Sequence, residues 1–190
     1  VSIGQTLFML AELKCRTQEI EIGQKHLLEA LNLFQEIKNY RWLAEALDLL
    51  SLIQYNFGSK EKGKEIFKEA IRAIEQTDDV RNKLKYYCKL AELYKIEKDF
   101  SEAEKLFKQV IEVASKTGED EEFFKATIDL VRIKHKEKNI KERNQIADDG
   151  VVYLRKVLVK TQRESKRAQT LGDIAAIYTE CENYQEATKY

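Results

Sequence analysis

Apolar residues along this chain recur at steps of three, four and seven, the spacing that places side chains on one face of an α-helix. Short polar links interrupt the pattern five times. After each link, a usually apolar residue stands three positions before a usually small one. The pairs are Ile20 with Gly23, Lys60 with Gly63, Phe100 with Ala103, Ile140 with Arg143, and Tyr184 with Ala187, at successive separations of 40, 40, 40 and 44 residues. This regular spacing predicts an internal repeat of two-helix units.

The repeat predicts nine helices and a short terminal one. The first helices of each pair are expected over 2–17, 40–57, 79–97, 119–138 and 162–181, and the second over 19–38, 60–76, 100–116 and 140–160, with the short helix beginning at 184. The sequence has no proline and only seven glycines. Because turns and sheets need such residues, their scarcity favours long helices joined by short links.

Small residues at matching places in the two helices of a pair predict where those helices approach closely. In the third unit these residues are Ala91 and Ala103, which we expect to be buried at a close helix crossing. The fourth unit carries Val131 and Arg143 at the same places. Its two helices must therefore pack differently.

The third unit resembles a tetratricopeptide repeat (TPR) through a set of aromatic, apolar and small residues at signature places: Tyr87, Leu90, Ala91, Tyr94, Phe100, Ala103, Phe107 and Val110. The last unit resembles it through Ile174, Ala175, Tyr178, Tyr184 and Ala187. This resemblance implies an all-α, right-handed superhelical solenoid of antiparallel helix pairs, forming a single domain over 1–190 with about four and a half units. The period of about 40 residues, against about 34 in the family, is similar to that of long-repeat variants. These include the sensor arms of signal-transducing ATPases and bacterial peptide-pheromone receptors.

The resemblance implies that the first helix of each pair lines a concave groove that holds a protein or peptide ligand. The helical phase then selects the groove residues Glu12, Glu45, Asp48, Tyr55, Asn56, Lys85, Glu92, Lys95, Lys125, Arg132, His135 and Lys136. These change from acidic to basic along the chain, a gradient that would orient an extended peptide. The alternative interpretation is an ordinary polar surface. The carboxylate clamp of chaperone-tail binders would need basic residues and asparagines at Phe8, Glu12, Leu49, Lys85 and Lys89, so that ligand is not expected.

Basic residues are concentrated in the fourth unit: Lys125, Arg132, Lys134, Lys136, Lys138, Lys141 and Arg143. They form either a positive wall for an acidic partner segment or a solvated charged face. Over the whole chain, 33 basic and 33 acidic residues cancel, so no net field attracts nucleic acid or anionic lipid. No apolar run approaches the ~20 residues of a membrane span. We therefore expect neither a nucleic-acid nor a membrane partner.

Candidate chemistry is sparse. Residues 58–64, GSKEKGK, fit most of a phosphate-binding loop, but Glu65 stands where a metal-binding Ser or Thr is needed, and a link between helices explains the stretch better. His26 and His135 lack neighbours at metal-ligand spacing. Cys15, Cys88 and Cys181 are odd in number and far apart, which is typical of free thiols in a cytoplasmic protein. No catalytic residues, cofactor or metal are predicted.

Two functions remain open. One is a peptide- or protein-binding scaffold or sensor module within a larger regulatory protein; the other is a structural spacer or self-association arm. A helical enzyme would need a polar pocket that the sequence does not indicate. Because the chain ends three residues after Ala187, we expect a truncated fragment with Ile174, Ala175 and Tyr178 partly uncovered. Such an end could pair with a second copy as a homodimer.

Overall fold

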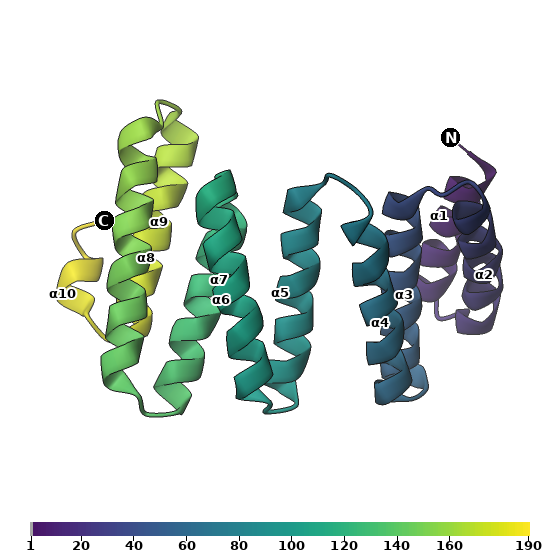
Figure 1. Ribbon diagram of the computed structural model, residues 1–190, viewed down its shortest axis with the longest axis horizontal. Helices are drawn as coiled ribbons and strands as arrows, with labels where there is room; N and C mark the ends of the chain where they lie inside the picture. Colours follow the sequence, from purple (N-terminus) through teal and green to yellow (C-terminus); the bar gives the residue numbers. More distant parts are fainter. Residues whose placement is uncertain (1) are drawn as a thin grey trace. The chain divides into compact units, whose positions relative to one another are not determined.

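The computed structural model describes residues 2–190, and all of its regular secondary structure over that range is helical. The helices are α1 (Ile3–Arg16), α2 (Ile20–Glu36), α3 (Tyr40–Phe57), α4 (Lys60–Glu75), α5 (Val80–Ile96), α6 (Phe100–Thr117), α7 (Asp120–Lys136), α8 (Ile140–Lys160), α9 (Glu164–Glu180) and the short α10 (Tyr184–Ala187). Paired helices run antiparallel (Figure 1). The predicted all-α fold of antiparallel helix pairs is thus confirmed.

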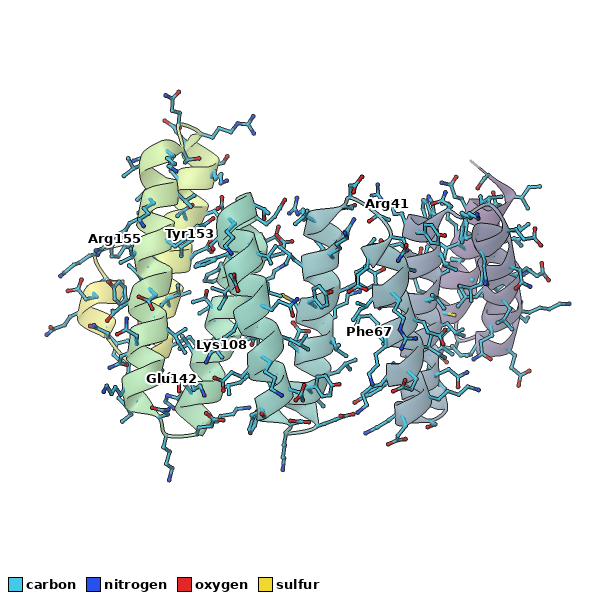
Figure 2. The ribbon with its side chains drawn as sticks, viewed as in Figure 1. Arg41, Phe67, Lys108, Glu142, Tyr153 and Arg155 are labelled. Carbon is cyan, nitrogen blue, oxygen red and sulfur yellow. The ribbon has the colours of Figure 1, made fainter. Side chains whose placement is uncertain are left out.

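The chain divides into two compact units, Val1–Tyr86 and Tyr87–Tyr190. In the first unit, the side chains of Phe8 and Phe34 pack with the ring of Trp42, at centroid distances of 5.6 and 5.9 Å. Phe67, labelled in Figure 2, stacks on Tyr86 at 5.7 Å. These aromatic contacts join α1, α2 and α3 at one end of the unit and α4 with the start of α5 at the other.

Small residues allow close helix crossings in the first unit. A Cβ atom added to Gly63 of α4 would lie 2.8 Å from the backbone nitrogen of Tyr55 and 2.9 Å from the carbonyl oxygen of Ser51, both in α3. One added to Gly23 of α2 would lie 2.7 Å from the Sγ atom of Cys15 in α1. Since backbone atoms cannot move aside, the glycine at 63 fixes the distance between α3 and α4.

In the second unit, Ala91 and Ala103 are both fully buried, which confirms their predicted burial; the close helix crossing at these residues stays a prediction. Other buried side chains of this unit include Phe107, Ile133 and Ile174, from α6, α7 and α9. The helix α7 packs against α6, α8 and α9. It is therefore the central helix of the unit.

The fourth unit accommodates its large residues by burying them. Val131 has no exposed surface, and Arg143 is only 6% exposed. The guanidinium of Arg143 donates to the Nδ1 atom of His135 at 3.0 Å and to the carbonyl oxygen of Cys181 at 3.3 Å. It also lies 3.8 Å from a carboxylate oxygen of Glu182. Arg143 of α8 thus links the ends of α7 and α9 by hydrogen bonds. A small residue at this position could not make these bonds.

Several links between helices share one backbone conformation. Lys98, Lys138 and Glu182 each have a positive φ, of 66°, 58° and 61°. The residue after each one donates its amide to a carbonyl five residues back, as Asp99 does to Tyr94 at 2.9 Å. This is the hydrogen bond of a Schellman C-cap. The side chain of the same Asp99 accepts a hydrogen bond from the amide of Glu102 and caps α6. Asp99 thus completes the end of α5 and the start of α6.

The end of the chain differs from the prediction. Ile174 is fully buried and Tyr178 is 9% exposed, so the expectation that these two lie partly uncovered is wrong, whereas Ala175 is half-buried, as expected. The helix α9 packs against α7, α8 and α10, and the ring of Tyr178 stacks with Tyr190 at 6.1 Å. These contacts cover Ile174 and Tyr178, and a homodimer through this end of the chain stays a prediction.

Gly63→Ala should lower the free energy of unfolding by about 1–3 kcal/mol, because the added methyl group meets α3 backbone. Gly172→Ala is the matched control in α9. It has no atom within 4 Å of the added Cβ, so it should gain about 0.5–1 kcal/mol from helix propensity. Urea denaturation followed by circular dichroism measures both. Equal effects of the two substitutions would contradict the close crossing.

Arg143→Ala should lower the free energy of unfolding by about 1.5–3 kcal/mol, because it removes the buried hydrogen bonds to His135 and to the carbonyl oxygen of Cys181. The exposed Arg163, at the start of α9, provides the control Arg163→Ala. Hydrogen exchange gives a second measurement: amides near Cys181 should exchange faster in Arg143→Ala alone. Unchanged protection there would show that Arg143 does not hold the end of α9.

Candidate functional site

A pocket of ≈ 420 Å³ opens in the second unit, where the ends of α5, α7 and α9 meet. Its lining combines cationic, acidic and apolar side chains: Lys95, Arg132, Ile133, His135, Lys136, Thr179, Glu180 and Glu182. Four of these, Lys95, Arg132, His135 and Lys136, were among the predicted groove residues. The helices α5, α7 and α9 are each the first helix of a pair. The pocket is therefore formed by the last turns of these first helices and by the link after α9.

Two of the cations in this pocket already have carboxylate partners. The Nζ atom of Lys95 lies 2.6 Å from a carboxylate oxygen of Asp129, which is 8% exposed. Arg132 donates to one carboxylate oxygen of Glu180, from its Nε atom at 2.9 Å and from a terminal nitrogen at 2.6 Å. These hydrogen bonds raise the pKa of Arg132. The pocket wall is thus a set of ion pairs between neighbouring helices.

Lys136 differs from these cations. Its Nζ atom lies over the ring of Phe100, 5.9 Å from the centroid, and within residues 2–190 the structure pairs it with that ring rather than with a carboxylate. The residue is exposed at the pocket mouth. Its positive charge is therefore directed toward solvent and toward any segment that occupies the pocket.

The predicted positive wall is only partly present. Lys134 is 5% exposed and binds Glu104 at 2.6 Å, Glu137 at 2.9 Å and Glu142 at 3.3 Å. Burial would lower the pKa of Lys134, but these hydrogen bonds outweigh it and raise the pKa. The prediction that Lys134 and Arg143 belong to a solvated or partner-facing basic surface is wrong. Both side chains are buried, and their charged groups bind other groups of the same unit.

Two further predicted residues, Glu92 and Lys125, lie beside this pocket rather than in its lining. Lys125 pairs with Glu121 at 2.7 Å. The residue Glu92 is exposed. Partial burial of its carboxyl group and the negative charge of Asp129 both raise the pKa of Glu92. Lys95 and Lys125 act in the opposite direction. These four charges therefore belong to one electrostatic cluster on α5 and α7.

The other six predicted residues lie in the first unit. Glu12 and Asn56 line a pocket of ≈ 340 Å³ with apolar residues that include Leu52 and Phe57. The charges of Glu45 and Asp48 add to burial in raising the pKa of Tyr86. The list is completed by Tyr55, whose ring lies under the Nζ atom of Lys60 at 5.6 Å, and by Lys85, which is exposed. One groove containing all twelve residues stays a prediction.

Sequence reasoning missed the α9 side of the pocket. Thr179 and Glu180 stand eight and nine positions after Leu171, the first signature place of the fifth unit. The helical phase that selected His135 and Lys136 in the fourth unit would have selected them as well. Glu182 lies in the link after α9, where helical phase gives no information. Its position depends on the positive φ of that link.

The described part of the chain has two further properties. Over residues 2–190, no three or more His, Cys, Asp or Glu side chains are grouped as a metal ion would require. No helix in that range has both the length and the apolar composition needed to cross a membrane. The stretch 58–64 joins α3 to α4, so its partial phosphate-loop pattern lies between two helices, without the preceding strand that such a loop needs.

Comparison with known proteins supports the fold. Residues 84–117 match the model of the tetratricopeptide repeat family, whereas no curated protein sequence matches the chain. A putative kinesin light chain with nearly identical TPR-like repeats, from Podosopora anserina, superposes with a TM-score of 0.63 and 16% identity, over 97% of this chain and 90% of that one.

Two other solved structures are similar. A Rap protein complexed with competence and sporulation factor gives a TM-score of 0.61 at 16% identity, over 98% of this chain and 61% of its own. Aspartyl phosphate phosphatase F from Bacillus subtilis gives 0.68 at 15%, over 98% and 57%. At these identities the likeness establishes the fold alone. The chain therefore has a TPR-like helical-repeat fold, and its residues 84–117 match a tetratricopeptide repeat.

Proposed function

We propose that this chain is a protein- or peptide-binding module of a larger regulatory protein, and that the pocket at the ends of α5, α7 and α9 receives the bound segment. The observation that carries the proposal is the mouth of this pocket, where Lys136 presents an exposed cation that no carboxylate neutralises within the described residues. A TPR-like fold supports it, because such folds are generally protein-interaction modules. The Rap structure contains a bound factor.

The charges indicate an acidic, extended partner segment. Its carboxylate would meet Lys136 first and could then exchange with Glu180 on Arg132. The Arg132–Glu180 pair is partly solvated, with side chains 50% and 31% exposed. Exposed ion pairs contribute little net free energy, so this exchange costs little.

In this proposal the chain works in the cytoplasm as part of a signalling protein and has no catalytic role of its own. Cys15, Cys88 and Cys181 are free thiols, a state that reducing compartments maintain. The second candidate function, a spacer or self-association arm, predicts no ligand in this pocket. A homodimer that forms without ligand would favour that candidate.

The test is fluorescence anisotropy with a fluorescein-labelled extended peptide of Asp, Glu and interspersed Leu. Lys136→Glu should weaken binding about tenfold, or roughly 1.4 kcal/mol, because it places like charges in contact. Lys141→Glu makes the same change in net charge at an exposed residue outside the pocket and should leave affinity unchanged. Raising the salt concentration should weaken binding to the native chain more than to Lys136→Glu.

Equal affinities for the two charge-reversed variants would contradict the pocket as the binding site. Light scattering of the free chain completes the experiment. A stable dimer combined with no binding of the acidic peptide would replace this proposal with the self-association arm.

A further inference from the structure

A second pocket lies on another side of α7, between α6 and α8. Its volume is ≈ 340 Å³. The lining comes from all three helices: Lys108, Ile111, Glu112, Ser115, Phe123, Thr127, Leu130, Ile146, Asp149, Gly150 and Tyr153. Figure 2 labels Lys108 and Tyr153 on the side of the second unit that faces the viewer. No residue of this pocket lines the one assigned to the proposed function, so it is a separate site.

The floor of this pocket is apolar and rigid. Phe123, Thr127 and Leu130 of α7 are 4%, 1% and 1% exposed, and they are covered from below by the core of the unit. Ile111 of α6 and Ile146 of α8 form half-buried walls. A side chain inserted between these walls would exchange water for apolar contact on three sides, which is the main source of affinity at such sites.

Gly150 keeps the space between α8 and α7 narrow at the floor and open above it. A Cβ atom at this position would lie 2.7 Å from the Cγ2 atom of Thr127. Gly150 therefore lets α8 lie close to α7, and it lines the pocket together with Ile146 and Tyr153 of the same helix. The pocket is thus a consequence of helix packing within the fourth unit.

Polar contacts close the two ends of the groove. At one end, the Nζ atom of Lys108 in α6 lies 3.3 Å from a carboxylate oxygen of Glu142 in α8. At the other end, Tyr153 donates its hydroxyl to Asp120 at 2.8 Å, and its ring lies 4.0 Å from that of Phe123. The first contact spans the groove from α6 to α8, and the second holds α8 against α7.

The rim of the groove is acidic. Glu112 on α6 and Asp149 on α8 stand on opposite banks and are both exposed. The positive charge of Lys108 is shared between Glu104 at 2.6 Å and Glu142 at 3.3 Å. Lys116 pairs with Glu112 across a solvated contact, with both side chains more than two-thirds exposed, and such pairs exchange readily. Asp149 accepts a hydrogen bond from the uncharged amide of Gln145 at 3.1 Å, so its negative charge is available to a cationic partner.

We propose that the groove between α6 and α8 docks an amphipathic helix of another protein, with one large apolar side chain seated on Phe123, Thr127 and Leu130 and flanking Lys or Arg side chains against Glu112 and Asp149. The volume suits one or two anchoring side chains. Helix-in-groove recognition uses such anchors spaced along one face of a helix. The partner is thus opposite in charge to the acidic segment proposed for the pocket at Lys136.

The probe is a fluorescein-labelled amphipathic helix of about five turns, built from Leu, Ala and Lys with one central Trp on its apolar face. Two comparison peptides replace every Lys by Glu, or the Trp by Ala. The native chain should bind the Lys peptide, and each comparison peptide at least about tenfold more weakly, a difference of about 1.4 kcal/mol. Equal binding of the Glu peptide would overturn the proposal.

Variants then locate the site. Ser115→Trp fills the groove from its rim, and Ser101→Trp makes the same change at an exposed serine of the same helix outside it. Asp149→Lys removes a rim carboxylate, and Asp148→Lys changes the adjacent exposed residue, which does not line the groove. We expect Ser115→Trp to weaken the binding of the Lys peptide at least tenfold and Asp149→Lys about threefold to tenfold, with both controls unchanged.

Lys136→Glu separates this proposal from the proposed function, because it should leave the affinity for the Lys peptide unchanged. A loss of binding in Lys136→Glu, or equal binding in Ser115→Trp and Ser101→Trp, would refute docking between α6 and α8. Circular dichroism of each variant checks that the fold is intact, so that a loss of binding reports on the groove itself.

Discussion

Two helices in one repeat unit can approach closely only where their facing side chains are small, and the rest of this structure depends on how each unit meets that constraint. Gly63 meets it directly, since its Cα faces the backbone of Tyr55 and Ser51. In the third unit Ala91 and Ala103 have no exposed surface, as the same constraint predicts. The fourth unit meets it at Gly150, where an added Cβ atom would lie 2.7 Å from the Cγ2 atom of Thr127, and it adds hydrogen bonds from the buried Arg143. The pocket at Lys136 includes His135, which contacts Arg143, and the groove between α6 and α8 includes Gly150.

Much of the fold could be predicted from the sequence because it depends on local regularities. Apolar residues that recur every three to four positions indicate helices, and small residues that recur about every 40 positions indicate repeated pairs of helices. The end of the chain was harder to predict. Ile174 and Tyr178 appeared uncovered because a complete second helix was missing after them. In the structure, α7, α8 and Tyr190 cover these residues instead, through contacts between positions too far apart for a periodic pattern to indicate.

The candidate site was predictable only in part. Helical phase identified Lys95, Arg132, His135 and Lys136 as neighbours on one face, and the structure brings these four to one pocket. Phase cannot tell which charges are used internally. Lys134 looked like an exposed base in the sequence, yet it is buried among Glu104, Glu137 and Glu142. Pairing of this kind depends on which helices are adjacent, and that follows from packing rather than from position along one helix.

Lys98, Lys138 and Glu182 adopt a left-handed backbone conformation that costs a residue with a side chain about 1–2 kcal/mol relative to glycine, while the amides that follow them complete the ends of helices. The chain thus places its least favourable backbone at exposed turns. An evolving sequence could adjust its melting temperature at Lys98 and Lys138, which line neither pocket, without changing either binding surface. At Glu182, which lines the pocket at Lys136, a change in the turn would also change recognition.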